Sequence, residues 1–156
     1  MFEIDKFAHD CRAAMKGTES MKAVRELVAE AVADPGALLK ALGEPTRGTV
    51  NCLHRSDDLT IINVIWAPRM TIMPHNHNMA AVIGVITGRE DNIFWRRITG
   101  DPQGHIEAAG ADSLGPRDAV QLGENIIHSV TNPTGLLTNA IHVSSGNFYK
   151  GNSQGV

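Results

Sequence analysis

The chain has 156 residues, a formal net charge of −3 at pH 7 and 42% hydrophobic residues, which is enough for one domain with a buried core. Acidic and basic residues are interspersed, so nothing indicates binding to nucleic acid or to an anionic membrane. No apolar run approaches the ~18 residues of a membrane span, and residues 1–6 lack the pattern of a secretory signal peptide. Two cysteines are too few for a disulfide framework, so we expect a protein of the reducing cytoplasm.

The first 42 residues have the periodicity of helices. Apolar residues recur there at helical spacing, and the clearest apolar face consists of Met21, Val24, Leu27, Val28, Ala31 and Val32. Residues 18–20 offer an N-cap before this face, and residues 34–36 interrupt the pattern before a short helix predicted over 37–42. We therefore expect residues 1–42 to form helices that pack on the rest of a single domain spanning 1–156.

Beyond residue 43 the pattern changes to short strands separated by turn residues. The nine predicted strands cover residues 49–54, 59–66, 70–77, 81–86, 92–98, 105–108, 118–122, 126–131 and 137–144. Many short strands at this spacing are typical of a β-sandwich or a barrel. The sequence thus predicts a mainly β region over 43–148, followed by a small, polar and frayed tail over 149–156.

Two histidines lie one residue apart at the end of a predicted strand. On an extended strand His75 and His77 would point to the same face, with Cα atoms roughly 6–7 Å apart. Two ring nitrogens can then bind one metal ion, and imidazole suits Fe, Zn, Cu or Ni. Because exposed strands also show this pattern by chance, the pair alone leaves a purely structural interpretation open.

A third histidine lies about fifty residues further on. His128 follows Gly123 and precedes Asn132 in a short apolar strand. Together with His75 and His77, this spacing resembles the two-part signature of the cupin superfamily. The resemblance implies a double-stranded β-helix, or jelly-roll barrel, in which the three histidines bind a metal ion.

Many cupins also have a glutamate ligand four or five residues after the second histidine. Here those positions hold Ala81 and Val82, which cannot bind a metal. Three neutral imidazoles would leave the charge of a divalent ion without a protein anion to offset it. Such a centre should favour an anionic, chelating substrate, with one position left for O2 or water. The residues alone do not exclude zinc with a bound water.

Residues 34–148 resemble the cysteine dioxygenase branch of the cupins, particularly small bacterial proteins identified as metal-dependent double-stranded β-helix enzymes. The resembling segments are 34–43, 74–77, 82–85, 88–92, 127–133 and 141–148. The resemblance implies non-haem Fe(II) held by His75, His77 and His128, with Zn, Ni or Mn as alternatives. It also implies O2-dependent oxidation of a small thiol to a sulfinate.

The last predicted strand departs from this branch. Cysteine dioxygenases carry a Ser-x-His-x-Tyr segment there, and the matching positions here are Ala140, His142 and Ser144. Strand alternation places His142 and Ser144 on one face, and we take both as candidate catalytic residues. Since Ser144 is too short to replace the phenol, we expect a thiol other than cysteine. No cross-link to a tyrosine can form at this position, and we expect Cys52 to pack in the barrel.

The branch also uses an arginine to pair with the substrate carboxylate, a task that suits a planar, bidentate guanidinium. Arg47 lies near the corresponding place and Arg96 lies on a predicted strand, so both are candidate substrate-binding residues. Arg55 and Arg97 are alternatives, and a solvated position is the competing interpretation for each.

Two other classes of function stay open. One is a metal-dependent cupin with different chemistry, such as carbon–carbon cleavage, a lyase reaction or an isomerisation. The other is a cupin that binds a small molecule without turnover. In the preferred interpretation the partners are a small-molecule substrate and O2, with no nucleic acid and no membrane. The sequence leaves the oligomeric state open, with a homodimer among the possibilities.

Overall fold

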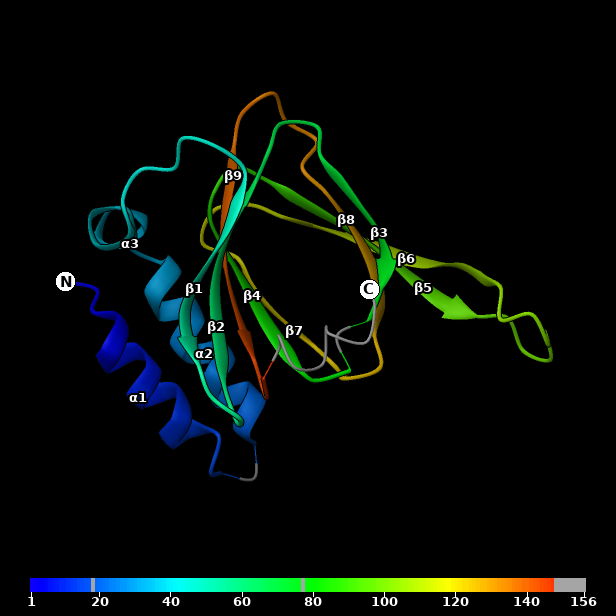
Figure 1. Ribbon diagram of the computed structural model, residues 1–156, viewed down its shortest axis with the longest axis horizontal. Coiled ribbons are helices and arrows are strands. Elements are labelled where there is room, and N and C mark those ends of the chain that lie inside the picture. Colours follow the sequence, from blue (N-terminus) through cyan, green and yellow to red (C-terminus); the bar gives the residue numbers. More distant parts are fainter. Residues whose placement is uncertain (18, 77, 148–156) are drawn as a thin grey trace.

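A computed structural model describes residues 1–17, 19–76 and 78–147. Within these residues three helices precede nine strands (Figure 1). The helices are α1 (Ile4–Ala14), α2 (Ser20–Val32) and α3 (Pro35–Leu42). The strands are β1 (Thr49–Arg55), β2 (Thr60–Trp66), β3 (Thr71–His75), β4 (Ala81–Thr87), β5 (Glu90–Arg97), β6 (Ile106–Leu114), β7 (Ala119–Leu122), β8 (Ile127–Thr131) and β9 (Thr138–Ser144).

The strands form two sheets of antiparallel pairs. One has the order β1-β2-β9-β4-β7 and the other the order β3-β8-β5-β6. Two apolar clusters contain residues from both sheets, so they fill the space between them. The first is Ile62, Val64, Trp66 and Val130 with Ile72, and the second is Ile83, Val85, Leu114 and Leu122 with Phe94 and Val120. This mainly β architecture preceded by helices confirms the predicted fold class.

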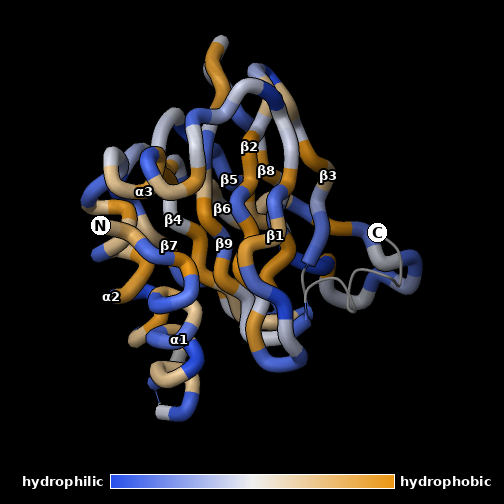
Figure 2. Tube along the Cα trace, turned by 60° about the vertical axis from the view of Figure 1, so that its left-hand side comes forward, coloured by the Kyte–Doolittle hydropathy of each residue, from blue (hydrophilic) through white to orange (hydrophobic). Residues whose placement is uncertain are grey.

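The helices cover the outer face of the five-stranded sheet, and Figure 2 shows their hydrophobic segments against its strands. Val24, Val28 and Val32 of α2 are fully buried in one cluster with residues of β2, β4 and β9. Gly84 of β4 allows this close approach, because a Cβ added there would lie 2.5 Å from Val28 Cγ1. The interpretation of the first 42 residues as helices was correct, and their apolar face is the one predicted.

The helix ends differ in part from the predicted ones. The N-cap residue of α2 is Glu19, whose side chain makes no capping hydrogen bond. α3 begins at Pro35, two residues earlier than predicted, and the Asp34 carboxylate accepts a hydrogen bond from the Ala37 N–H. Proline suits the first turn of a helix because its missing N–H would be unsatisfied there in any case.

β6 is much longer than predicted. It pairs with β5 from Ile106 to Leu114, past a bulge between Phe94 and Trp95. Most of β6 is exposed and its small residues have no clear alternation, so periodicity alone underestimated its length.

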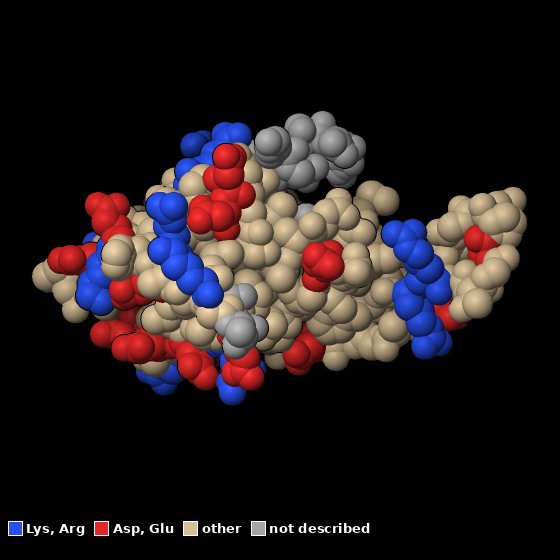
Figure 3. All heavy atoms as spheres, turned by 90° about the horizontal axis from the view of Figure 1, so that it is seen from below, with Lys and Arg blue, Asp and Glu red and all other residues tan. Residues whose placement is uncertain are grey.

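Figure 3 shows acidic and basic side chains next to one another over the helical end of the molecule. No helix in the described part of the chain is both long and apolar enough to cross a membrane.

Candidate metal centre

His75 and His128 meet between adjacent strands of the four-stranded sheet. β3 and β8 are antiparallel, and these two residues lie opposite each other in the register. Their ring centroids are 4.7 Å apart, with an angle of 51° between the ring planes. His128 is almost completely buried, whereas His75 is half-buried. His77, the third predicted ligand, lies outside the described residues.

Each of the two imidazoles has a partner at Nδ1. His75 Nδ1 lies 2.8 Å from the Met73 carbonyl oxygen, which can only accept a hydrogen bond. His128 Nδ1 lies 2.7 Å from Asn92 Oδ1. With the ring proton on Nδ1, the lone pair of a neutral imidazole is on Nε2. Metal-binding histidines commonly use this arrangement, because a partner at one nitrogen orients the other toward the metal.

A buried carboxylate that the sequence analysis missed is linked to His128 through Asn92. Glu90 is fully buried, and its Oε1 accepts a hydrogen bond of 3.1 Å from Asn92 Nδ2. Trp66 Nε1 donates to Oε2 at 3.0 Å. Burial acts to raise the pKa of Glu90, but His142, Asn92 and Trp66 outweigh it and hold that pKa below its ordinary value.

Strand alternation would have predicted the opposite orientation of β5. Its apolar residues, such as Ile93, suggest an inward-facing set, yet Ile93 is 39% exposed while Glu90 and Asn92 are buried. The only sequence signal was the position of Glu90 two residues after the hairpin glycine, Gly88, in the 88–92 segment. Because burying a carboxylate is unfavourable unless it is hydrogen-bonded, its partners had to be known first.

His142 lies on β9 with its side chain 7% exposed. Its Nε2 is 3.8 Å from Glu90 Oε2, and this nitrogen is buried without a hydrogen-bond partner among the described residues. Since Glu90 belongs to the facing sheet, the imidazole points into the space between the sheets. Ser144 is also buried and follows His142 by two residues on the same strand, so it shares that face.

The two candidate arginines have contacts elsewhere. Arg96 is exposed and pairs with Glu107 of β6 at 2.9 Å. Arg47 is exposed in the connection from α3 to β1 and lines a polar pocket of about 200 Å³ with Asn51 and Asn63. That pocket lies on the outer face of the sheet, since Asn63 alternates with residues of the inner cluster. The structure therefore does not bring either arginine to the two histidines.

Cys52 differs from the expectation. It is exposed on β1 and not packed in the barrel. β1 is an edge strand of the five-stranded sheet, and Cys52 Sγ contacts the His54 carbonyl at 3.7 Å. The sequence predicts a strand here, but it does not indicate which strand lies at the edge of the sheet.

The candidate ligands among the described residues suit a transition-metal ion. No group of three His, Cys, Asp or Glu side chains able to hold a metal occurs among the described residues. His75 and His128 nevertheless present two imidazoles from facing positions, and imidazole suits Fe, Zn and Ni. Both oxygens of Glu90 accept hydrogen bonds, one from Trp66 and the other from Asn92.

Solved structures are similar to this chain in fold. An RmlC-like cupin family protein with a double-stranded β-helix fold from Methanocaldococcus jannaschii gives a TM-score of 0.56 at 12% identity, over 69% of this chain and 88% of that one. A cupin superfamily protein from Desulfitobacterium hafniense gives 0.52 at 15% identity, over 68% and 85%. The fold is that of the cupins. No protein-family model and no curated protein matches the sequence.

Some of the similar cupins are metal-dependent enzymes. Oxalate decarboxylase from Bacillus subtilis, which has Mn(II) centres, gives a TM-score of 0.50 at 16% identity. The match covers 67% of this chain but only 27% of the decarboxylase. At these identities the likeness shows the cupin fold and does not transfer an activity.

Proposed function

We propose that this cupin is an Fe(II)-dependent thiol dioxygenase that oxidises a small thiol to a sulfinate. The observation that carries the proposal is the facing pair of imidazoles, His75 and His128, each with a hydrogen-bond partner at Nδ1. His77 would complete the ligand set. The resemblance of the sequence to the cysteine dioxygenase branch supports iron over zinc, nickel or manganese.

The overall reaction needs no further reductant. A thiol and one O2 molecule contain all the atoms of the sulfinic acid, because both oxygen atoms end on sulfur and the acid releases one proton. When bound, Fe(II) would supply the activation of O2 for its reaction with the thiol sulfur. The remaining tasks, which are to exclude water, to hold a proton and to orient the ligands, fall to the side chains of the barrel.

The interior of the barrel suits these tasks. Two apolar clusters share the space between the sheets with the polar residues, and an apolar lining of this kind would limit the access of water. His142 places a ring nitrogen that lacks a hydrogen-bond partner among the described residues in this space, so it can take up the thiol proton. Ser144 is buried and too short to replace the phenol of a tyrosine, which favours a thiol other than cysteine.

The test combines metal analysis of the purified protein with O2 consumption over a panel of small thiols. We expect bound iron, and one O2 consumed per sulfinate formed for at least one thiol. His128→Ala should lose most of the metal and the activity. His105→Ala is the matched control, because His105 is exposed and paired with Asp101 at 2.7 Å. Full metal occupancy in His128→Ala, or iron without thiol-dependent O2 uptake, would contradict the proposal.

A further inference from the structure

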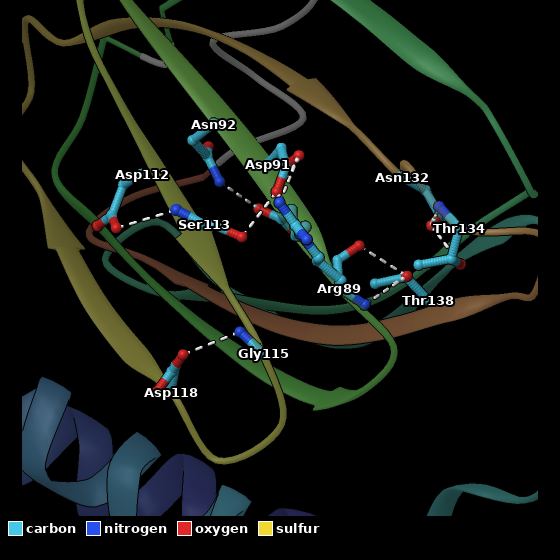
Figure 4. A network of polar contacts seen from close by, with 11 residues as sticks. Arg89, Asp91, Asn92, Asp112, Ser113, Gly115, Asp118, Asn132, Thr134 and Thr138 are labelled. Atoms are coloured by element: carbon cyan, nitrogen blue, oxygen red, sulfur yellow. Dashed lines mark hydrogen bonds and ion pairs between the residues drawn. The ribbon is translucent and has the colours of Figure 1, made fainter.

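Glu90 lies at the centre of a chain of hydrogen bonds that runs from Trp66 to His128. Trp66 Nε1 lies 3.0 Å from Glu90 Oε2, Asn92 Nδ2 lies 3.1 Å from Glu90 Oε1, and Asn92 Oδ1 lies 2.7 Å from His128 Nδ1. All four residues are buried. The line drawn from the amide nitrogen of Asn92 in Figure 4 marks the central bond of this chain.

Only one assignment of donors and acceptors is consistent with this series of hydrogen bonds. The indole of Trp66 can only donate, and an ionised carboxylate can only accept. Asn92 must therefore turn its NH2 group toward Glu90 and its oxygen toward His128. Since an amide oxygen cannot donate, the proton between Asn92 and His128 has to be on His128 Nδ1. The lone pair of the neutral ring is then on Nε2.

We propose that Glu90 and Asn92 are positioning residues that fix the tautomer of His128 and so prepare its Nε2 to bind a metal. This inference rests on the proposed role of His128 as a ligand, but not on the reaction that the metal catalyses. It gives a function to a fully buried carboxylate that is not itself a ligand. Partners of this kind typically change metal affinity by about 10–100-fold.

The variant Glu90→Gln should reverse the donor and acceptor roles of Asn92 and His128. Trp66 can only donate, so it requires the amide oxygen of the new glutamine, and the glutamine NH2 group then faces Asn92. Asn92 must turn over to accept that bond, which presents its own NH2 group to His128. His128 Nδ1 then has to accept, and the ring proton moves to Nε2, where it competes with the metal.

A second substitution should restore the original tautomer. In Trp66→Phe combined with Glu90→Gln, no indole N–H fixes the glutamine, whose oxygen can again face Asn92. His142 Nε2, at 3.8 Å from the carboxylate oxygen, is too far away to impose the same orientation by a hydrogen bond. Trp66→Phe alone keeps the carboxylate and should keep the tautomer. If Glu90 only stabilised the fold, the double variant would bind the metal less tightly than Glu90→Gln alone.

Two measurements on the same proteins test the proposal. Long-range ¹H–¹⁵N correlation spectra of the metal-free protein, labelled at histidine nitrogens, report which nitrogen of His128 carries the proton. Competition with a chelator gives the affinity for Zn²⁺, a probe without redox chemistry. We expect Nε2–H and about 10–100-fold weaker Zn²⁺ binding in Glu90→Gln, with both changes largely reversed in the double variant. Asp91→Asn is the matched control, because Asp91 lies on the same strand and binds the exposed Arg89.

The outcomes separate this inference from the proposed function. An unchanged tautomer in Glu90→Gln, or a double variant that binds Zn²⁺ no better than the single one, overturns the positioning role. If the tautomer and the affinity change as expected while no thiol is oxidised by the iron-loaded wild type, the positioning role stands and the thiol dioxygenase proposal fails.

Discussion

Replacement of Asn132 by aspartate tests which hydrogen bonds stabilise the turn after β8. Its Nδ2 donates to the carbonyl oxygens of Trp66, Ala67 and Leu136 at 3.2, 3.1 and 2.7 Å. Its Oδ1 accepts from the backbone N–H of Thr134 at 3.0 Å and from the Thr134 hydroxyl at 2.8 Å. Figure 4 shows Asn132 beside Thr134. The side chain is completely buried.

Asn132→Asp keeps the size of the side chain but replaces the NH2 group by oxygen. A protonated aspartic acid can donate to one of the three carbonyl oxygens, which leaves two without this donor. At about 1–3 kcal/mol for each buried group, and with part of the turn accessible to water, we expect the free energy of unfolding to fall by about 2–4 kcal/mol.

The loss should also depend on pH. Three facing carbonyl oxygens disfavour the ionised form, so the pKa of the new aspartate is raised in the folded state. Above the unfolded-state pKa of about 3.9, the unfolded chain loses its proton first. The stability of the variant should then fall by about 1.4 kcal/mol per pH unit until the pH reaches the folded-state pKa.

The assay is urea unfolding of wild type and variant between about pH 4 and pH 7, a range that begins near the unfolded-state pKa. Asn132→Ala is the control, because it loses the same hydrogen bonds without gaining an ionisable group. The difference between Asn132→Asp and wild type should widen with pH, whereas that for Asn132→Ala should stay constant. A constant difference for both variants would refute the reasoning about the three carbonyl oxygens.

Two further predictions concern the helical layer and the interior of the barrel. Gly84→Ala should lower the free energy of unfolding by about 1–3 kcal/mol, since the added Cβ would lie 2.5 Å from Val28 Cγ1. Adding Val28→Ala should recover part of that loss in urea unfolding. His142→Ala should keep its metal but lower turnover by about 10–100-fold, as shown by metal analysis and O2 consumption on the same sample.

Much of the fold could be predicted because apolar periodicity is a local property. The faces of α2 and of the buried strands β2, β4 and β9 are set by residues a few positions apart, and all nine predicted strands are present in the described residues. The prediction of β6 was too short where its small, exposed residues give no alternation. Cys52 was misplaced because its exposure depends on which strand forms the edge of the sheet.

The candidate site could be predicted only where a motif marks it. His75 and His128 were recognised from their spacing in the sequence, and the structure places them opposite each other. Glu90 could not be found in this way, because its burial depends on Trp66 and His142 from the facing sheet. A residue whose partners are distant in the chain has no local signal, even when it contacts the neighbour of a predicted ligand.

Glu90 also changes the charge argument made from the sequence. That argument assumed that no protein anion lies near the three imidazoles, because Ala81 and Val82 replace the usual glutamate ligand. The structure places a carboxylate one side chain away from His128, through Asn92, with His142 Nε2 at 3.8 Å. The imidazole of His142 faces this carboxylate and screens it, so the positive charge of a metal ion would remain available to an anionic substrate. In His142→Ala the buried carboxylate loses that partner, so an anionic thiol should bind less well while a neutral thiol of similar size is affected less. Parallel KM measurements with such a pair of thiols test this, and equal changes for both would show that His142 acts without balancing the charge of Glu90.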